Sequence, residues 1–180
     1  MHLINRIYLS AAQEAVEWLK LKSKIQKTNN KIYKAMLKVK FYRILHNNAS
    51  YIELDTLMGE NVCFPHGLCG VFISKGAVIG DNCTIFQQVT IGSNTFSDTK
   101  FPGAPKIGNN VYIGAGAKII GGITIGNNVR IGANTVVFKD VPDNCTVVND
   151  LDLKIIKNSH KKDNTFKSYD KYIGEKNETD

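Results

Sequence analysis

The sequence contains few of the residues from which metal and redox sites are built. Its 180 residues include four histidines and four cysteines, and no two cysteines form a CxxC pair. These residues are His2, His46, His66 and His160, and Cys63, Cys69, Cys83 and Cys145. Zinc sites and disulfide frameworks need closely spaced ligands or pairs, so we predict no metal. We interpret the cysteines as small core residues in a reducing cytoplasm.

Long apolar runs are also missing. No stretch approaches the roughly 20 consecutive apolar residues that a bilayer-spanning helix requires. The apolar stretch near the start is soon interrupted by Gln13, Glu14 and Glu17, so we do not expect a signal peptide either. The expected location is the cytoplasm.

Acidic residues are scarce in the first part of the chain. Residues 1–50 carry ten Lys and Arg against two Glu, a net charge of +8, whereas residues 51–180 carry thirteen against fourteen. The basic segment lacks the interleaved aromatic residues of a nucleic-acid platform, so no nucleic-acid partner is expected. We favour a solvated helix face. A weak contact with a membrane surface or another polyanion is the alternative left open.

The strongest positive signal is an aliphatic residue at every sixth position. A smaller apolar residue or Thr follows each of these residues four positions later, and glycine often follows directly. The ladder comprises Ile73, Ile79, Ile85, Ile91, Ile107, Ile113, Ile119, Ile125, Ile131 and Val137. Neither a helix nor an amphipathic strand has a period of six, and the strands of a β-sandwich keep no fixed spacing. The pattern therefore predicts a solenoid in which each hexad supplies one short strand and a turn.

The segments on either side of the ladder have different patterns. Residues 3–27 and 31–45 have helical spacing, and the second helix is expected to bury part of its apolar side chains. Those side chains are Ile32, Ala35, Leu37, Val39, Tyr42 and Leu45. We therefore divide the chain into a basic helical segment (residues 1–50), a domain of β-coils (51–150) and a polar tail (151–180).

The ladder is interrupted once. Ile91 and Ile107 are sixteen residues apart, which is not a multiple of six. The polar residues 93–105 must therefore leave the solenoid as a loop, and long loops in compact repeats usually have a function.

His66 is the only histidine that enters the solenoid, in the segment Phe64-Pro65-His66-Gly67 that precedes the regular ladder. Proline and glycine disturb a coil and can turn a side chain outward. Near neutral pH an imidazole is well suited to accept a proton from a hydroxyl. From its position alone, His66 is equally well explained as a structural histidine or as a general base.

Five segments carry a family resemblance that covers roughly residues 51–148. They are His66-Gly-Leu-Cys-Gly-Val, Asn82-Cys-Thr-Ile-Phe-Gln-Gln-Val-Thr-Ile-Gly92, Pro105-Lys-Ile-Gly, Ile113-Gly-Ala-Gly-Ala-Lys118 and Ile131-Gly-Ala-Asn-Thr-Val-Val-Phe-Lys-Asp-Val-Pro142. Together with the ladder, they resemble the hexapeptide-repeat acyltransferases, specifically the serine O-acetyltransferase branch. The resemblance implies a mainly β fold, a left-handed parallel β-helix, in a homotrimer that binds acetyl-CoA in a groove between neighbouring prisms.

The resemblance also assigns roles to residues. The histidine that matches His66 is the general base in that family, and backbone amides near Gly92 and Ser93 are candidates for stabilising the oxyanion. The binding site of the donor acetyl-CoA would be lined by Ala115, Gly116, Ala117, Ala133, Phe138 and Lys139. Small residues let the pantetheine arm approach the backbone, and Lys139 suits a phosphate.

The acceptor side departs from the serine enzymes. Pro65 stands where they carry an Asp before the catalytic histidine, Gly103 and Ala104 replace an Arg-His pair, and Tyr51 replaces the acid that orients the base. Glu53 or Asp55 is a candidate to orient His66 instead, the alternative being an exposed carboxylate.

These losses favour a neutral acceptor. We therefore predict an O-acetyltransferase that acts on a sugar hydroxyl of a surface polysaccharide or its precursor. Serine O-acetylation for cysteine biosynthesis is the main alternative, and a non-catalytic assembly module is a second. The hexapeptide-repeat carbonic anhydrases need three histidines on zinc, so a single histidine near the coils argues against them.

Overall fold

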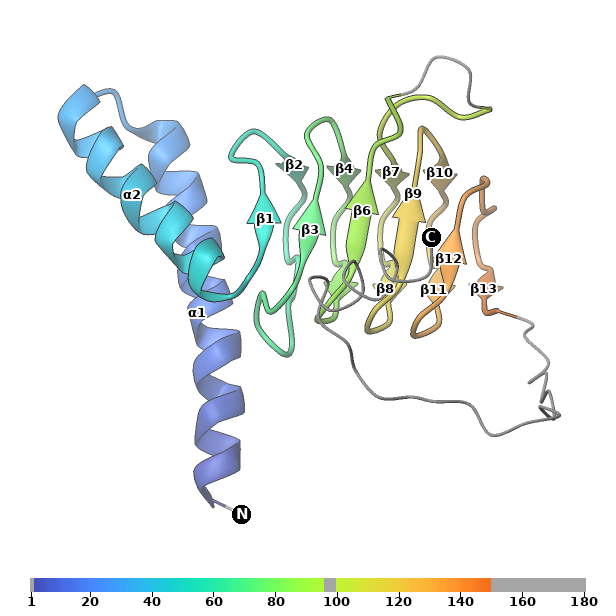
Figure 1. The fold of residues 1–180 in the computed structure, drawn as a ribbon, viewed down its shortest axis with the longest axis horizontal. Coiled ribbons are helices and arrows are strands. Elements are labelled where there is room, and N and C mark those ends of the chain that lie inside the picture. The colour runs from blue at the N-terminus through green and yellow to red at the C-terminus, as the bar shows by residue number, and fades with distance from the viewer. Residues whose placement is uncertain (1, 96–99, 150–180) are drawn as a thin grey trace, which may run out of the picture. The chain divides into compact units, whose positions relative to one another are not determined.

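The computed structural model describes residues 2–95 and 100–149, with side chains from residue 11 onward. The described residues belong to one compact unit, in which two helices precede thirteen short strands (Figure 1). The predicted tail, residues 151–180, and His160 within it lie outside the described residues.

The strands form three parallel sheets that run along the prism. Sheet 1 comprises β1 (Tyr51–Ile52), β3 (Phe72–Ile73), β6 (Thr90–Gly92), β9 (Lys118–Ile120) and β12 (Val136–Val137). Sheet 2 comprises β2 (Leu57–Met58), β4 (Val78–Ile79), β7 (Lys106–Ile107) and β10 (Thr124–Ile125). Sheet 3 comprises β5 (Thr84–Ile85), β8 (Tyr112–Ile113), β11 (Arg130–Ile131) and β13 (Thr146–Val147). The chain visits the sheets in the order 1, 2, 3, so each turn of the prism has three corners.

The register shows how the hexad produces this shape. In a regular turn, partners on neighbouring strands are three hexads apart, as Ile73 is from Ile91. The separation in sequence between partners is longer for Ile91 and Ile119, because the loop after β6 leaves the prism between them. It is also longer for Ile52 and Ile73 in the first turn. Both irregular turns therefore insert residues at a corner while the strands remain in register.

The ladder residues fill the interior. Ile73, Ile85, Ile91 and Ile113 are fully buried, and the companion residues Val71 and Val89 lie beside them without measurable exposure. Burying this apolar surface supplies the main stabilisation of the prism. The predicted mainly β solenoid of hexapeptide repeats is confirmed.

The corner between sheets 2 and 3, which we call the asparagine corner, shows why glycine follows so many ladder residues. A Cβ on Gly80 would lie 2.6 Å from the carbonyl oxygen of Gly108 in the next turn, so glycine allows close approach there. The left-handed backbone conformation falls two positions later, on Asn82 and Asn110, which have φ values of 56° and 55°. Asparagine tolerates this region better than most residues do. The side chains of Asn110 and Asn128 also form a hydrogen bond between neighbouring turns.

The helices α1 (His2–Lys27) and α2 (Lys31–Asn47) pack together and against the first turn of the prism. Trp18 is fully buried, and its ring stacks on Phe41 and meets the edge of Phe64. Lys22 is only 6% exposed, and its ammonium donates to the carbonyl oxygens of Leu54 and Thr56 at 2.6 and 2.8 Å. Neither helix is long and apolar enough to span a membrane, as far as the described residues extend.

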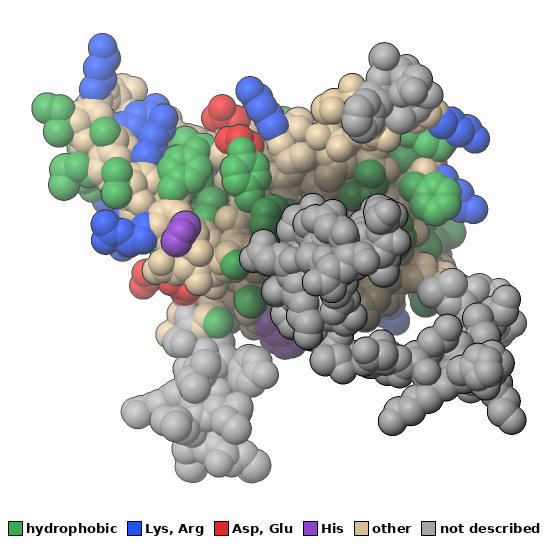
Figure 2. Space-filling model, viewed as in Figure 1, with side chains coloured by type: hydrophobic (Ala, Val, Ile, Leu, Met, Phe, Trp, Pro, Cys, Tyr) green, Lys and Arg blue, Asp and Glu red, His purple; other side chains and the backbone are tan. Residues whose placement is uncertain are grey.

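The predicted buried face of α2 is wrong in part. Phe41, Ile44 and Leu45 are buried, whereas Ile32 and Val39 are 77% and 59% exposed. The other side chains in this exposed set are Tyr33, Met36 and Tyr42. The sequence has apolar residues on both sides of this helix, so spacing alone could not select the side that faces α1. Apolar and basic side chains lie together at the helical end of the molecule (Figure 2). The predicted weak contact of this segment with a membrane surface stays a prediction.

The interpretation of the cysteines as core residues holds for Cys83, which is buried, but not for Cys63 and Cys69, which are exposed. Burial raises the pKa of the Cys83 thiol. All four thiols are free.

Candidate functional site

His66 lies in an enlarged corner between sheets 3 and 1, which we call the His66 corner. In the next turn, the corresponding corner between β5 and β6 is regular. In the first turn, Cys63 pairs with Thr84 and Phe72 pairs with Thr90, so the segment between Cys63 and Phe72 is three residues longer. The extra residues push the chain outward and leave the His66 side chain exposed.

The His66 imidazole has two contacts in the next turn of the prism. Its Nδ1 lies 2.7 Å from Oε1 of Gln87, and its ring meets the edge of Phe86 with centroids 5.1 Å apart. An amide oxygen accepts hydrogen bonds, so this contact favours the tautomer with the proton on Nδ1, in which Nε2 is the nitrogen that can act as a base. That is the tautomer that a general base requires.

The helices support this enlarged corner. Gly70 N donates to the carbonyl oxygen of Asn48 at 2.8 Å, and the Ser50 hydroxyl donates to the carbonyl oxygen of Leu68. Gly67 has a φ of 73°, and a Cβ there would lie 2.9 Å from Cβ of Ala11 on α1. The basic helical segment therefore holds the backbone that follows His66.

The small residues predicted to line the donor lie along the same edge of the prism. Gly116 N donates to the carbonyl oxygen of Gln87 at 3.0 Å, and Asn134 N donates to that of Ala115 at 2.8 Å. His66, Gln87, Ala115 and Ala133 thus occupy the His66 corners of successive turns, together with Gly116 and Ala117. With no large side chain at Ala115, Gly116 or Ala133, this edge leaves room for an extended ligand beside the backbone.

Gly92 and Ser93 lie at the opposite end of sheet 1, at the corner between sheets 1 and 2, which we call the loop corner. The ends of the loop are paired because Asn94 and Gly103 exchange hydrogen bonds at 2.8 and 2.7 Å. Phe138 and Lys139 follow β12 and lie exposed at this same side of the prism. One chain therefore does not bring Gly92, Ser93, Phe138 and Lys139 together with His66.

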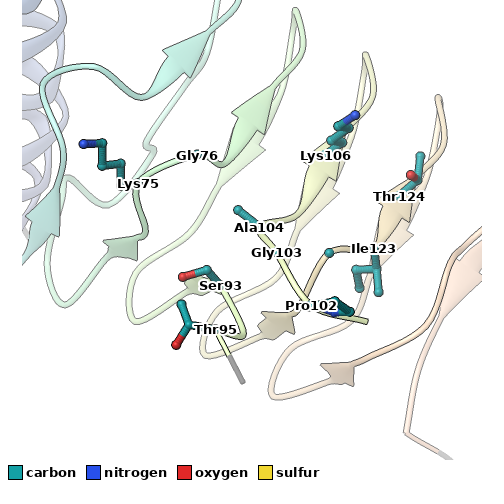
Figure 3. A pocket seen from close by; sticks show the side chains of 11 residues that line it. Lys75, Gly76, Ser93, Thr95, Pro102, Gly103, Ala104, Lys106, Ile123 and Thr124 are labelled. Carbon is teal, nitrogen blue, oxygen red and sulfur yellow. The ribbon is translucent and has the colours of Figure 1, made fainter. Parts of the chain in front are cut away.

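A pocket of about 600 Å³ lies at the loop corner (Figure 3). Ser93 and Thr95 border it from the first half of the loop, and Gly103 borders it from the second half. Lys75 and Lys106 stand on opposite sides of it, and no acidic side chain is among its described lining residues. The described lining of the pocket thus includes two cations and no acid, with the two ammonium groups pointing away from each other (Figure 3).

A second, apolar pocket of about 240 Å³ lies at the last turn. Phe138, Lys139 and Val147 are among its lining residues. The pair predicted to contact the donor therefore has an apolar surface next to a cation.

The two carboxylates predicted to orient His66 lie elsewhere. Glu53 and Asp55 follow β1 and belong to the loop corner of the first turn, whereas His66 precedes β3. The Tyr51 hydroxyl donates to Glu53, and this hydrogen bond raises the pKa of the Tyr51 phenol. The structure gives the orienting position at Nδ1 to Gln87 instead.

Sequence reasoning missed Gln87. A regular coil of three hexads would place Thr84 above His66, and only the enlarged corner shifts Gln87 into that position. The available signal was the segment from Phe64 to Val71, whose proline and glycines mark extra residues in the turn.

Within residues 2–95 and 100–149, no cluster of three or more His, Cys, Asp or Glu side chains could hold a metal ion.

Comparison with known proteins extends these observations. The family profile described as bacterial transferase hexapeptide (six repeats) matches residues 104–139. The chain is 48% identical over 91 residues to a serine acetyltransferase of Synechococcus elongatus, which covers 51% of this chain and 36% of the relative. It is 47% identical to a serine acetyltransferase of Staphylococcus epidermidis over an alignment of the same length, which covers 41% of that relative.

Solved structures agree over a longer part of the chain. Serine acetyltransferase isoform 3 from Entamoeba histolytica, in complex with cysteine, superposes with a TM-score of 0.62 at 30% identity and covers 81% of this chain and 51% of that chain. The Neisseria gonorrhoeae serine acetyltransferase gives a TM-score of 0.63 at 29% identity and covers 76% and 53%. The chain thus spans about two fifths of the length of the curated relatives and about half that of the solved structures.

The predicted resemblance to the hexapeptide-repeat acyltransferases, in their serine acetyltransferase-like branch, is therefore confirmed. The fold is that of a left-handed parallel β-helix with a short helical segment before it.

The same comparisons contradict the predicted sugar acceptor. These relatives and structural neighbours are serine acetyltransferases, and nothing in them supports a role in polysaccharide synthesis. The prediction assumed that losing the Arg-His pair at Gly103 and Ala104 left a neutral pocket. It overlooked Lys75 and Lys106, which are distant in sequence but border that pocket.

Proposed function

We propose that this chain is an acyltransferase that moves the acetyl group of acetyl-CoA to the hydroxyl of serine. The observation that carries the proposal is the hydrogen bond between His66 Nδ1 and Gln87 Oε1, on the edge that also presents Ala115, Gly116 and Ala133. The serine acetyltransferases to which the chain is similar support serine as the acceptor.

The geometry fits a direct transfer. His66 Nε2 accepts the proton of the serine hydroxyl while the oxygen attacks the thioester carbonyl. The tetrahedral intermediate then collapses, the carbon–sulfur bond breaks, and the imidazolium returns its proton to the CoA thiolate. The chain's own contribution is to hold the imidazole in the tautomer with the proton on Nδ1, because Gln87 accepts that proton in a hydrogen bond.

The donor is proposed to lie along the His66 corners. Ala115, which is half-buried, and Ala133, which is exposed, leave the backbone accessible to a pantetheine arm. Gly116 is buried, and the predicted lining residue Ala117 is buried in the interior of the prism. Lys139, with Phe138 beside it, supplies a cation for a phosphate of the nucleotide.

The acceptor is proposed to place its carboxylate near Lys75 and Lys106. A carboxylate gains from nearby cations, and no acidic side chain is among the described residues that line this pocket. The pocket therefore offers a substitute for the charged residues that the serine enzymes carry at the positions of Gly103 and Ala104.

The loop corner and the His66 corner lie at opposite ends of sheet 1 in one chain. We propose that a neighbouring copy in a homotrimer brings them together, so that Gly92 and Ser93 of one chain serve His66 of another. Their amides would then face the oxyanion, where such donors have their largest effect.

The experiment is an assay of CoA release with serine, a panel of other amino acids and a panel of sugars. The expected result is rapid turnover with serine that falls about 10²- to 10⁴-fold in His66→Ala, because the base is lost. His46→Ala, which removes an exposed histidine on α2, is the control and should retain full activity. An unchanged rate in His66→Ala would reject the mechanism, and turnover with a sugar but not serine would reject the acceptor.

A further inference from the structure

Gln88, next to the partner of His66, has an unusual backbone. Its φ of 60° lies in the left-handed region. The corresponding positions in the other turns are Gly70, Gly116 and Asn134, with φ values of 64°, 72° and 54°. Glycine and asparagine are the residues that tolerate this conformation. Gln88 has neither advantage, so other contacts must keep it there.

Lys118 provides such a contact. Its ammonium donates to the carbonyl oxygen of Gln88 at 2.6 Å, from the first position of β9 in the following turn. A hydrogen bond from a charged donor is stronger than one between neutral groups. The contact therefore fixes the direction of the carbonyl that follows the left-handed residue.

The peptide between Gln87 and Gln88 is held on both sides. The Gln88 N–H donates to the carbonyl oxygen of Cys69 at 2.9 Å, below it in the enlarged His66 corner. The Gln87 carbonyl accepts a hydrogen bond from Gly116 N at 3.0 Å, in the His66 corner of the following turn. If Gln88 left the left-handed region, this peptide would rotate and the Gln87 side chain would turn away from His66.

We propose that Lys118 is a positioning residue for His66, because it holds Gln88 in its left-handed conformation and so keeps the Gln87 amide at the imidazole. Lys118 needs no contact with either substrate for this role. The catalytic part of the inference rests on the proposed acetyl transfer, whereas the effect on the imidazole does not.

The test is a double-mutant cycle between Lys118 and Gln88. Lys118→Met removes the ammonium, and Gln88→Gly removes the need for it, because glycine adopts a positive φ without strain. We expect Lys118→Met to lower kcat about tenfold with little change in either KM, because the imidazole is misplaced rather than the substrates. In the Gln88→Gly background, Lys118→Met should lower kcat by less than about twofold.

A second readout does not depend on activity. Long-range ¹H–¹⁵N spectra of the imidazole, assigned by the loss of its signals in His66→Ala, report which ring nitrogen carries the proton. The wild type should show Nδ1–H, Lys118→Met a mixture of tautomers, and the double variant Nδ1–H again. These spectra separate the two proposals: the inference holds if the tautomer responds, even if no acceptor is acetylated.

Two controls guard against a general loss of structure. Lys118→Arg keeps a charged donor and should retain both activity and the tautomer. Arg130→Met removes an exposed cation from the corresponding first position of β11 and should change neither. Equal losses from Lys118→Met in the presence and absence of Gln88→Gly, or an unchanged tautomer in Lys118→Met, would overturn the inference.

Discussion

His66 and Gln87 meet because the first turn of the prism is three residues longer than a regular one. Cys63 and Thr84, which form a bridge between these turns, are as far apart in sequence as His66 and Gln87, whose Nδ1 and Oε1 atoms form the hydrogen bond. The insertion therefore moves the histidine outward and selects its partner at the same time.

Replacing that neutral partner by an acid should change the pH profile. In Gln87→Glu, the carboxylate favours the protonated imidazole, so the acid limb of the rate profile should move to higher pH. Measuring kcat/KM between about pH 5 and 9 would show the shift. Gln26→Glu, which adds the same charge on α1, should leave the profile in place. Coincident profiles for wild type and Gln87→Glu would show that Gln87 does not act on the base.

The cations of the loop pocket should affect the acceptor and not the donor. Lys75→Met and Lys106→Met should each raise the KM for serine by about tenfold, because a hydrogen bond to a charged group is lost, and leave the KM for acetyl-CoA unchanged. Lys20→Met removes an exposed cation from α1 and serves as the control. If the KM for acetyl-CoA rises instead, the pocket takes part of the donor.

Lys139 should act on the phosphate-bearing end of the donor. Lys139→Met should raise the KM for acetyl-CoA by about tenfold while the KM for acetyl-pantetheine, which has no phosphate, stays the same. A comparison of steady-state kinetics with the two donors measures the difference. An equal rise for both would place Lys139 near the pantetheine arm rather than a phosphate.

Lys22 should leave a signature in stability. Burial lowers its pKa from the ordinary value of 10.5, with nearby Asp55 opposing this shift. The folded chain then binds fewer protons than the unfolded chain between the lowered pKa and 10.5, so the contribution of Lys22 to the unfolding free energy increases as pH rises through that interval.

Lys22→Met should lack this increase. At neutral pH it should also lose about 2 kcal/mol, because the carbonyl oxygens of Leu54 and Thr56 lose their donor. Denaturant unfolding across this pH range, with Lys20→Met as the exposed control, measures both effects. If the stability of Lys22→Met follows the same pH dependence as that of Lys20→Met, the ammonium is not buried in solution.

The sequence predicted the scaffold because its rule is local and repeated. Each hexad places one aliphatic side chain inside, as Ile85 and Ile113 do, and ten repetitions leave no competing fold. It predicted the exposed position of His66 because Pro65 and Gly67 interrupt that rule. The structure confirms that the side chains at every sixth position lie in the interior of the prism, as their period implied.

The partner of His66 and the charge of the loop pocket could not be predicted in the same way. Both depend on which residues stand above one another in successive turns, and an insertion of unknown length changes that alignment. Gln87 lies beside His66 only because the segment between Cys63 and Phe72 has three extra residues. Lys75 and Lys106 border one pocket although the loop separates them in sequence. The buried face of α2 was missed for a similar reason, since only the packed partner distinguishes Phe41 from Val39.

Each contact described for His66 and its supports joins one turn of the prism to the next or to the helices. The base and its supports are therefore confined to a short height along the axis, and the later turns carry the residues proposed to contact the donor. Adding or removing a whole three-hexad turn beyond β11 should leave the base and its partner where they are, and should change only the length over which a bound donor can be contacted. The length of this solenoid therefore sets how much of the donor the chain can contact, while the position of the base stays fixed.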